Sequence, residues 1–166
     1  SYPRDVTGDG LLDIFVTNFS EELNTLYTNL GGGLFEDATQ KAGLGAGFIP
    51  LGFGTKMYDV DNDGDLDIHV TNGHVIDNVK LFQPNLSYAQ KDLLFENVGA
   101  HFRDVTAQSG PALQVERVGR GPGDAQTFCQ CGLARGKLRA EGAIDGSGAV
   151  DRIEIGESQA VGEVEH

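Results

Sequence analysis

The sequence of 166 residues is short of basic side chains and of long apolar runs. It carries 12 Lys and Arg against 25 Asp and Glu, which gives a formal net charge of −13. Proteins that bind nucleic acids use clustered Lys and Arg to displace the counterions of the phosphates, so we expect no nucleic-acid partner. A helix that crosses a bilayer needs roughly 20 consecutive apolar residues, and since no such run exists we expect no membrane span. The excess of carboxylates favours cations as partners.

Cysteine pairs and catalytic signatures are equally scarce. Cys129 and Cys131 are too few for a disulfide framework and too close for an ordinary bridge, so their role stays open. No G-x-S-x-G sequence supplies a nucleophile turn, and we predict no catalytic residue. His69 is expected on a strand, packed or at the surface, and His74 is a loop residue that is a candidate for lining a binding surface.

What the sequence does contain is an internal repeat. Residues 5–18 read DVTGDGLLDIFVTN and residues 59–72 read DVDNDGDLDIHVTN, which agree at ten of fourteen positions with an offset of 54. A second pair follows, in which LYTN (26–29) and FEDATQKAG (35–43) recur as LFEN (94–97) and FRDVTAQSG (102–110). The offset there grows to 68 and then 67, so the second copy holds an insertion of about 13 residues, which we expect to be a surface loop.

Each copy has the pattern of short strands. Ile14 and Val16, like their counterparts Ile68 and Val70, alternate with residues of the opposite face at a period near two. The glycines at residues 31–33 allow the positive φ of a tight turn between two strands. Strands that recur about every 50 residues, without a stripe of period 3.6, indicate repeated small sheets. We therefore predict an all-β fold whose repeats are four-stranded antiparallel blades of a β-propeller.

The repeat divides the chain into three parts. The predicted parts are a first repeat at residues 1–48, a second at 49–115 with its insertion at 73–92, and a third at 116–166. The third begins with RVGRG, which stands where LGFG precedes the second acidic loop, yet only Asp124 follows it. A divergent blade, a deletion that joins distant segments and a shifted reading frame all fit this region.

The length predicts an incomplete propeller. At roughly 40 to 50 residues per blade the chain makes about three blades, fewer than the four to eight that close a propeller. The chain also begins at Ser1 rather than at Met, as expected of a cut end. We therefore expect the missing blades to belong to a longer protein.

The acidic part of each repeat has the spacing of a cation-binding loop. Residues 59–67 place carboxylates at positions 1, 3, 5 and 9, with Gly64 at position 6 for the sharp turn. Ca²⁺ takes about six to eight oxygens at about 2.3 to 2.6 Å, which a loop curled around the ion can supply. The predicted ligands are Asp59, Asp61, Asp63, Asp67 and the carbonyl of Asp65 in one loop, and Asp5, Thr7, Asp9, Asp13 and the carbonyl of Leu11 in the other.

The acidic loops do not fit an EF-hand. An EF-hand needs a bidentate Glu at position 12 between helices, whereas position 12 here is Val16 or Val70 inside a predicted strand. Merely solvated acidic turns remain an alternative, more so for residues 5–13, where Thr7 replaces one carboxylate and a weaker site is expected. The side chain of Asp65 is expected to face water.

Residues 52–74 (GFGTKMYDVDNDGDLDIHVTNGH) and 93–110 (LLFENVGAHFRDVTAQSG) together resemble FG-GAP or VCBS repeats. They are most similar to bacterial relatives of cartilage acidic protein that carry an ASPIC/UnbV segment, and VDRIEI at residues 150–155 resembles part of that segment. The resemblance covers residues 3–121. It implies a propeller with Ca²⁺ in each acidic loop, held by the ligands given above, and export to the periplasm or the cell exterior.

The sequence leaves two functions open. The first is a non-catalytic, integrin-like calcium-binding segment of an exported protein, which mediates adhesion by binding a protein or a glycan. The alternative is part of a secreted carbohydrate-acting enzyme whose catalytic residues lie outside these 166 residues. An adjoining catalytic domain in the full-length gene would favour the second.

Overall fold

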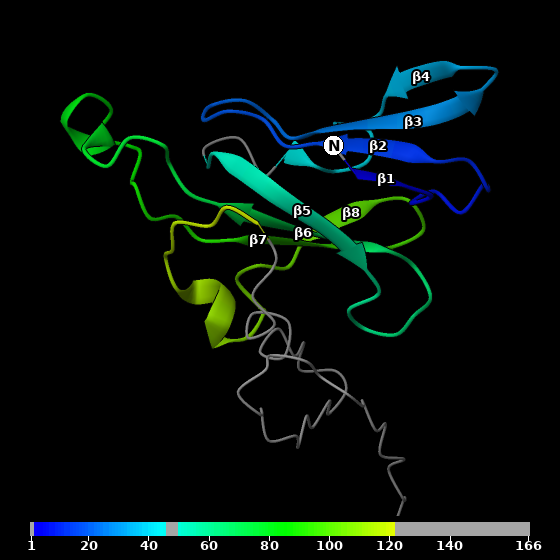
Figure 1. The fold of residues 1–166 in the computed structure, drawn as a ribbon. Coiled ribbons are helices and arrows are strands. Elements are labelled where there is room, and N and C mark those ends of the chain that lie inside the picture. The colour runs from blue at the N-terminus through cyan, green and yellow to red at the C-terminus, as the bar shows by residue number, and fades with distance from the viewer. Residues whose placement is uncertain (1, 46–49, 122–166) are drawn as a thin grey trace, which may run out of the picture.

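The structure, a computed structural model, describes residues 2–45 and 50–121. They form two four-stranded antiparallel sheets, with strand orders β1-β2-β3-β4 and β5-β6-β7-β8 (Figure 1). The first sheet holds β1 (Tyr2–Arg4), β2 (Asp13–Val16), β3 (Thr25–Gly31) and β4 (Leu34–Asp37). The second holds β5 (Gly52–Tyr58), β6 (Asp67–Asn72), β7 (Leu93–Asn97) and β8 (Phe102–Asp104). The predicted all-β fold, with one four-stranded antiparallel sheet in each of the first two repeats, is confirmed.

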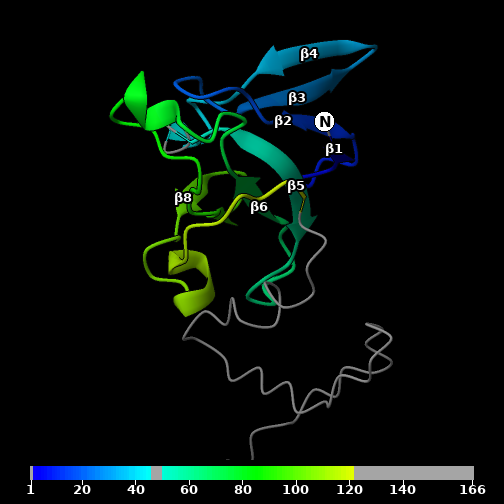
Figure 2. The same cartoon turned by 60° about the vertical axis from the view of Figure 1, so that its left-hand side comes forward.

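The two sheets are arranged like neighbouring blades. β1 lies close to β5, whereas β4 is at the edge of the first sheet that is farthest from the second (Figure 2). None of the described helices has the length and apolar character that a membrane crossing requires.

Equivalent hydrogen bonds recur in the two sheets. The amide of Leu26 donates to Oγ1 of Thr39 at 3.0 Å, and the amide of Leu94 donates to Oγ1 of Thr106 at 2.9 Å. The three glycines at residues 31–33, which end β3 and form the turn to β4, all have positive φ, as the sequence predicts. The repeated residues therefore build one structural unit twice.

The hydrophobic core fills the space between the sheets. Phe15 and Leu26 of the first sheet are buried in one cluster with Ile68 and Phe95 of the second. Each such side chain contributes about 1.5 to 3 kcal/mol when it is fully buried. The cluster is completed by Val6, Ala42, Leu44, Met57, Val70, Leu93 and Phe102. Because side chains alternate between the two faces of a strand, this cluster uses one face of each sheet.

The second sheet is covered on both faces. All six residues of β6 are buried. Leu94, on β7, packs with Val105 and with Leu113 of the 3₁₀ helix η3 (Pro111–Gln114). The segment that follows β8 therefore covers the face of this sheet that is turned away from the first.

The first sheet leaves apolar side chains exposed. Tyr27 and Phe35 are 38% and 44% exposed, whereas their repeat counterparts Phe95 and Phe102 are 0% and 1% exposed. The first sheet covers Phe95 and Phe102, and no described segment covers Tyr27 and Phe35 in the same way. The two sheets therefore differ because, among the described residues, only the second has a neighbouring sheet on this face.

The insertion of the second repeat connects β6 and β7. It carries the short 3₁₀ helix η2 (Val79–Leu81), and Leu81 and Phe82 are highly exposed there. Val79 and Leu86 of the same insertion are buried. The insertion thus presents apolar side chains on a folded support.

The described chain ends where the third repeat is predicted to begin. The amide of Gly119 donates to the carbonyl of Asn72 at 2.8 Å, as the amide of Gly52 donates to the carbonyl of Asn18 at 3.1 Å. Residues 117–121 thus contact the end of β6. The start of β5 contacts the end of β2 in the same way. The expectations for Asp124, Cys129, Cys131 and residues 150–155 fall outside the described residues.

Candidate metal centre

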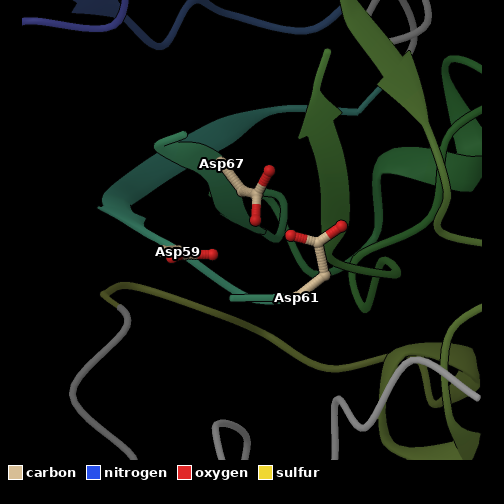
Figure 3. Close-up of side chains that lie close together, drawn as sticks. All are labelled: Asp59, Asp61 and Asp67. Carbon is tan, nitrogen blue, oxygen red and sulfur yellow. The ribbon is translucent and has the colours of Figure 1, made fainter. Parts of the chain in front are cut away.

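The second acidic loop joins β5 to β6 and gathers three carboxylates. One oxygen each of Asp59, Asp61 and Asp67 lies within 4.8 Å of the others (Figure 3). Among the described residues, no other group of three or more His, Cys, Asp or Glu side chains converges in this way. Two ligands of one Ca²⁺ can be separated by at most about twice the bond length, roughly 4.6 to 5.2 Å, and each pair of these oxygens meets this limit.

The loop is wound around the first of its carboxylates. Oδ1 of Asp59 accepts the amide of Asn62 at 2.7 Å, and Oδ2 accepts the amide of Gly64 at 3.0 Å. Asn62 and Gly64 both have positive φ, of 64° and 98°. The expected sharp turn at Gly64 is therefore present, and it brings position 3 of the loop towards position 9.

Asp67 is the buried end of the cluster. Its Oδ2 accepts the amide of Val60 at 2.7 Å and its Oδ1 accepts the amide of Asn97 at 2.8 Å. Burial raises the pKa of Asp67 to about 6, although these two hydrogen bonds act in the opposite direction. Burial and then the charge of Asp63 raise the pKa of Asp61. Ionisation of both carboxyl groups is thus less favourable in the folded chain than in water.

The first acidic loop, between β1 and β2, is folded in the same way. Asp5 accepts the amides of Gly8 and Gly10 at 2.7 and 2.8 Å. These amides, that of Gly10 above all, lower the pKa of Asp5. Asp13 accepts the amides of Val6 at 3.0 Å and Asn29 at 2.9 Å, as Asp67 accepts those of Val60 and Asn97.

The two loops differ in how far their acids converge. Asp5, Asp9 and Asp13 do not form a close group like that of the second loop. Position 3 is Thr7, whose hydroxyl donates to Asp13 at 3.3 Å instead of adding a carboxylate. Oδ1 of Asp9 accepts the amide of Leu11 at 2.8 Å.

Asp63 and Asp65 are both in the second loop, outside the group of three. Oδ1 of Asp63 accepts the amide of Asp65 at 2.9 Å. The side chain of Asp65 does not simply face water as expected, because its Oδ2 accepts the amide of Gly99 at 3.3 Å. The sequence pattern alone predicts no role for Asn29 and Asn97, although they are the last residues of the repeated four-residue segments LYTN and LFEN.

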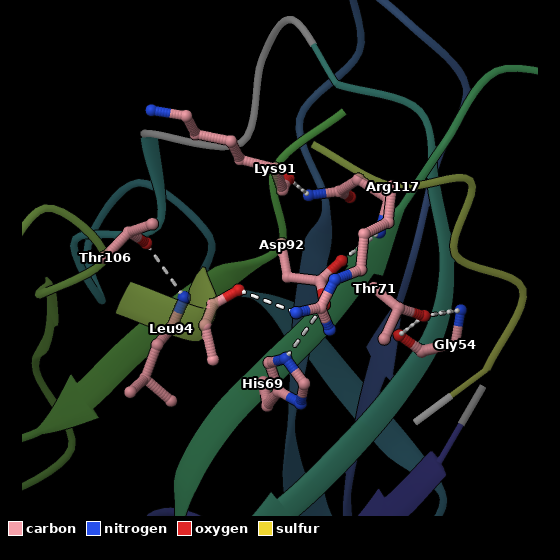
Figure 4. A network of polar contacts seen from close by, with 10 residues as sticks. Gly54, His69, Thr71, Lys91, Asp92, Leu94, Thr106 and Arg117 are labelled. Atoms are coloured by element: carbon pink, nitrogen blue, oxygen red, sulfur yellow. Dashed lines mark hydrogen bonds and ion pairs between the residues drawn. The ribbon is translucent and has the colours of Figure 1, made fainter. Parts of the chain in front are cut away.

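The two candidate histidines are buried in the structure. His74, a candidate for lining a binding surface, is instead buried. Its ring packs edge-on against Phe19, and its Nδ1 accepts the amide of Ile76 at 3.0 Å. His69 occupies the repeat position of Phe15, and its Nε2 is 3.6 Å from Oδ2 of Asp92 (Figure 4). These histidines therefore belong to the interior of the second repeat.

Comparison with known proteins agrees with this arrangement. Residues 5–70 match the FG-GAP-like repeat. The matched segment of the FG-GAP-like repeat contains both acidic loops, from Asp5 to beyond Asp67, and ends within β6. It therefore covers β2, β3 and β4 of the first sheet and the part of the second sheet that positions the candidate metal centre. A search of curated proteins found no match to the chain.

The raised pKa of Asp67 predicts an unusual pH dependence in metal-free buffer. The folded chain binds this proton more tightly than the unfolded chain does, because the ordinary pKa is 3.8 and the folded value is about 6. The Asp67 contribution to the free energy of unfolding should therefore increase as the pH falls from about 7 to 4. In thermal melts in EDTA, the Tm of the wild type relative to that of Asp67→Asn should therefore rise by a few degrees as the pH falls from about 7 to 4. A pH-independent difference would contradict this assignment.

Proposed function

We propose that this chain is a non-catalytic calcium-binding segment of a β-propeller, and that Asp59, Asp61 and Asp67 form its principal ion site. The convergence of these three carboxylates within 4.8 Å carries the proposal. The donor set consists of oxygen atoms, which suits a hard cation such as Ca²⁺. The raised pKa values of Asp61 and Asp67 also support a cation, because its charge would relieve the repulsion and the cost of burial.

The proposal extends to the first loop and to the remaining ligands. Asp5, Thr7, Asp9 and Asp13 would hold a second, weaker ion, and the carbonyls of Leu11 and Asp65 would complete the two sites, with Asp63 as a further ligand of the principal one. The repeated contacts of Asp13 and Asp67 support equivalent roles. When bound, Ca²⁺ would supply charge compensation and fix the loop between two strands.

We further propose that the chain belongs to a longer exported protein of the ASPIC/UnbV type, located in the periplasm or outside the cell, and acts in adhesion. The uncovered Tyr27 and Phe35 support a preceding blade, because the same positions are buried in the second repeat. The exposed Leu81 and Phe82 of the insertion support a protein or glycan ligand, since apolar groups clustered at a surface mark interaction sites.

Calcium titration of the thermal stability tests the proposed ion site. At a free Ca²⁺ concentration of 100 times Kd, the chain should be more stable by about 2.7 kcal/mol, with a Tm several degrees higher. Asp61→Asn should remove most of this gain, because it removes the charge of one of the three converging carboxylates. The loop itself should be little disturbed, since the one hydrogen bond of this side chain among the described residues is a long one, of 3.3 Å from the amide of Asp63. Asp77→Asn, an exposed acid in the insertion, is the matched control and should keep the gain. A Tm of the wild type that does not respond to Ca²⁺ would refute the proposal.

A further inference from the structure

One buried side chain connects the two acidic loops. Asn97, at the end of β7, is 1% exposed. Its Nδ2 donates to the carbonyl of Leu66 at 3.2 Å in the second loop and to the carbonyl of Val6 at 3.0 Å in the first. Its Oδ1 accepts the amide of Ala100 at 2.8 Å, which fixes the orientation of the side-chain amide. Both hydrogens of Nδ2 are thus used, one on each loop.

The connection continues to the last carboxylate of each loop. The backbone amide of Asn97 donates to Oδ1 of Asp67 at 2.8 Å. On the other side, the peptide unit whose carbonyl receives the bond from Asn97 is the one between Val6 and Thr7. The amide of Thr7 in that unit donates to Oδ2 of Asp13 at 3.3 Å. A continuous chain of polar contacts therefore runs from Asp67 through Asn97 and one peptide unit to Asp13.

We propose that calcium binding in one loop strengthens calcium binding in the other, and that the side chain of Asn97 carries this coupling. The inference rests on the proposed calcium sites. An ion that fixes Asp67 also fixes Leu66 and Asn97, and Asn97 in turn holds the Val6 peptide against Asp13. The second ion then binds a loop in which the Val6 peptide unit is already ordered, so the loop loses less conformational entropy on binding. Linked hydrogen bonds in a buried site also polarise one another in the same direction.

The first repeat offers a matched comparison. The backbone amide of Asn29 donates to Asp13 at 2.9 Å, and its Nδ2 donates to the carbonyl of Leu12 at 3.1 Å. Its Oδ1 accepts the amide of Gly31 at 2.9 Å. Among the hydrogen bonds of the described residues, Asn29 thus repeats the contacts of Asn97 within its own repeat but has none to the other acidic loop.

Calorimetric titration of the 166-residue chain with CaCl₂ tests the coupling. Asp9→Asn weakens Ca²⁺ binding at the first loop. In the described part of the chain, Asp9 has no hydrogen bond to the second loop. With coupling, this variant should bind Ca²⁺ at the second loop roughly fivefold or more weakly than the wild type does. Asp61→Asn should likewise weaken Ca²⁺ binding at the first loop. At Ca²⁺ concentrations that leave the altered loop empty in each variant, the two factors should be equal, because linkage between binding sites is reciprocal. Equal affinities of the second loop with and without Asp9 would overturn the inference while leaving the calcium sites intact.

Replacement of Asn97 tests whether its side chain carries the coupling between the two loops. Asn97→Ser keeps the backbone amide that contacts Asp67 but removes the bridge, so Asp9→Asn should no longer affect the second loop in this background. Asn29→Ser should keep the coupling, and its loss there would overturn the assignment to Asn97. If circular dichroism shows Asn97→Ser to be unfolded, the reciprocity between Asp9→Asn and Asp61→Asn decides the coupling. Absence of any Ca²⁺ binding to the intact chain would refute the proposed function and the coupling together.

Discussion

Replacement of Phe95 by alanine should lower the free energy of unfolding by about 3 to 5 kcal/mol. Phe95 is on β7 of the second sheet, and its side chain is fully buried in the cluster that also holds Phe15 and Leu26 of the first sheet. Truncation removes the transfer free energy of the ring and leaves a cavity between two sheets that cannot easily collapse. This loss is a large part of the roughly 5 to 15 kcal/mol that stabilises a typical domain.

Phe82→Ala is the matched control for this prediction. The residue type is the same, but Phe82 is 72% exposed in the insertion, so its truncation should change the free energy of unfolding by about 0.5 kcal/mol or less. Urea denaturation followed by circular dichroism measures both variants. Similar losses for the two variants would contradict a core shared between the sheets.

The repeat in the sequence was sufficient to predict most of the local structure. Alternation around Ile14 and Ile68 indicated strands, and the glycines at residues 31–33 indicated the turn between β3 and β4. These features depend on residues close in sequence, whose side-chain period and φ preferences are local properties. The positions of Asp59, Asp61 and Asp67 could be predicted for the same reason, since the whole loop is nine residues long.

Contacts between the repeats could not be predicted in this way. Asn97 and Val6 are 91 residues apart, so their hydrogen bond depends on how the two sheets are placed against each other. The position of His74 likewise depends on distant segments, because its ring packs edge-on against Phe19 and its carbonyl accepts a hydrogen bond from Arg120 at 2.9 Å. A repeat indicates which residues are equivalent, but not which of them meet a neighbouring unit.

The burial difference between the repeats shows the same limit. Tyr27 and Phe95 are equivalent in sequence and lie at equivalent places on their sheets. Their exposure differs because one sheet has a neighbour on that face and the other has none among the described residues. The sequence predicted missing blades from length alone, whereas this difference identifies the face on which a preceding blade would pack.

Gly43→Ala should be far more damaging than its position in a loop suggests. Gly43 has a φ of +83°, and a Cβ there would collide with the carbonyl oxygen of Phe102 and lie 2.9 Å from the ring of His101. Backbone strain alone costs about 1 to 2 kcal/mol at positive φ. Because the clash is with backbone of the second sheet, the chain must also move away from β8, so we expect a total loss clearly above that range.

Gly32→Ala separates the strain from the clash. Gly32 has a similar φ of +62°, but no atom lies within 4 Å of its added Cβ, so only the strain of about 1 to 2 kcal/mol is expected. Amide hydrogen exchange adds a local measurement, because the amide of Phe102 donates to the carbonyl of Ala42 at 2.7 Å. Protection of this amide should be lost in Gly43→Ala and kept in Gly32→Ala. Equal losses of stability in the two variants would show that the close approach to β8 is unimportant.

The Gly43 contact also bears on the acidic loops. Phe102 is paired with Asn97 in the register of β7 and β8. A shift of the first repeat away from Phe102 would therefore change the distance between Asn97 and the Val6 carbonyl, which belong to opposite sides of the same junction. Gly43→Ala should thus reduce the calcium coupling between the loops as well as the stability, whereas Gly32→Ala should leave the coupling unchanged. Calorimetric titration of both variants, with and without Asp9→Asn, would detect the difference.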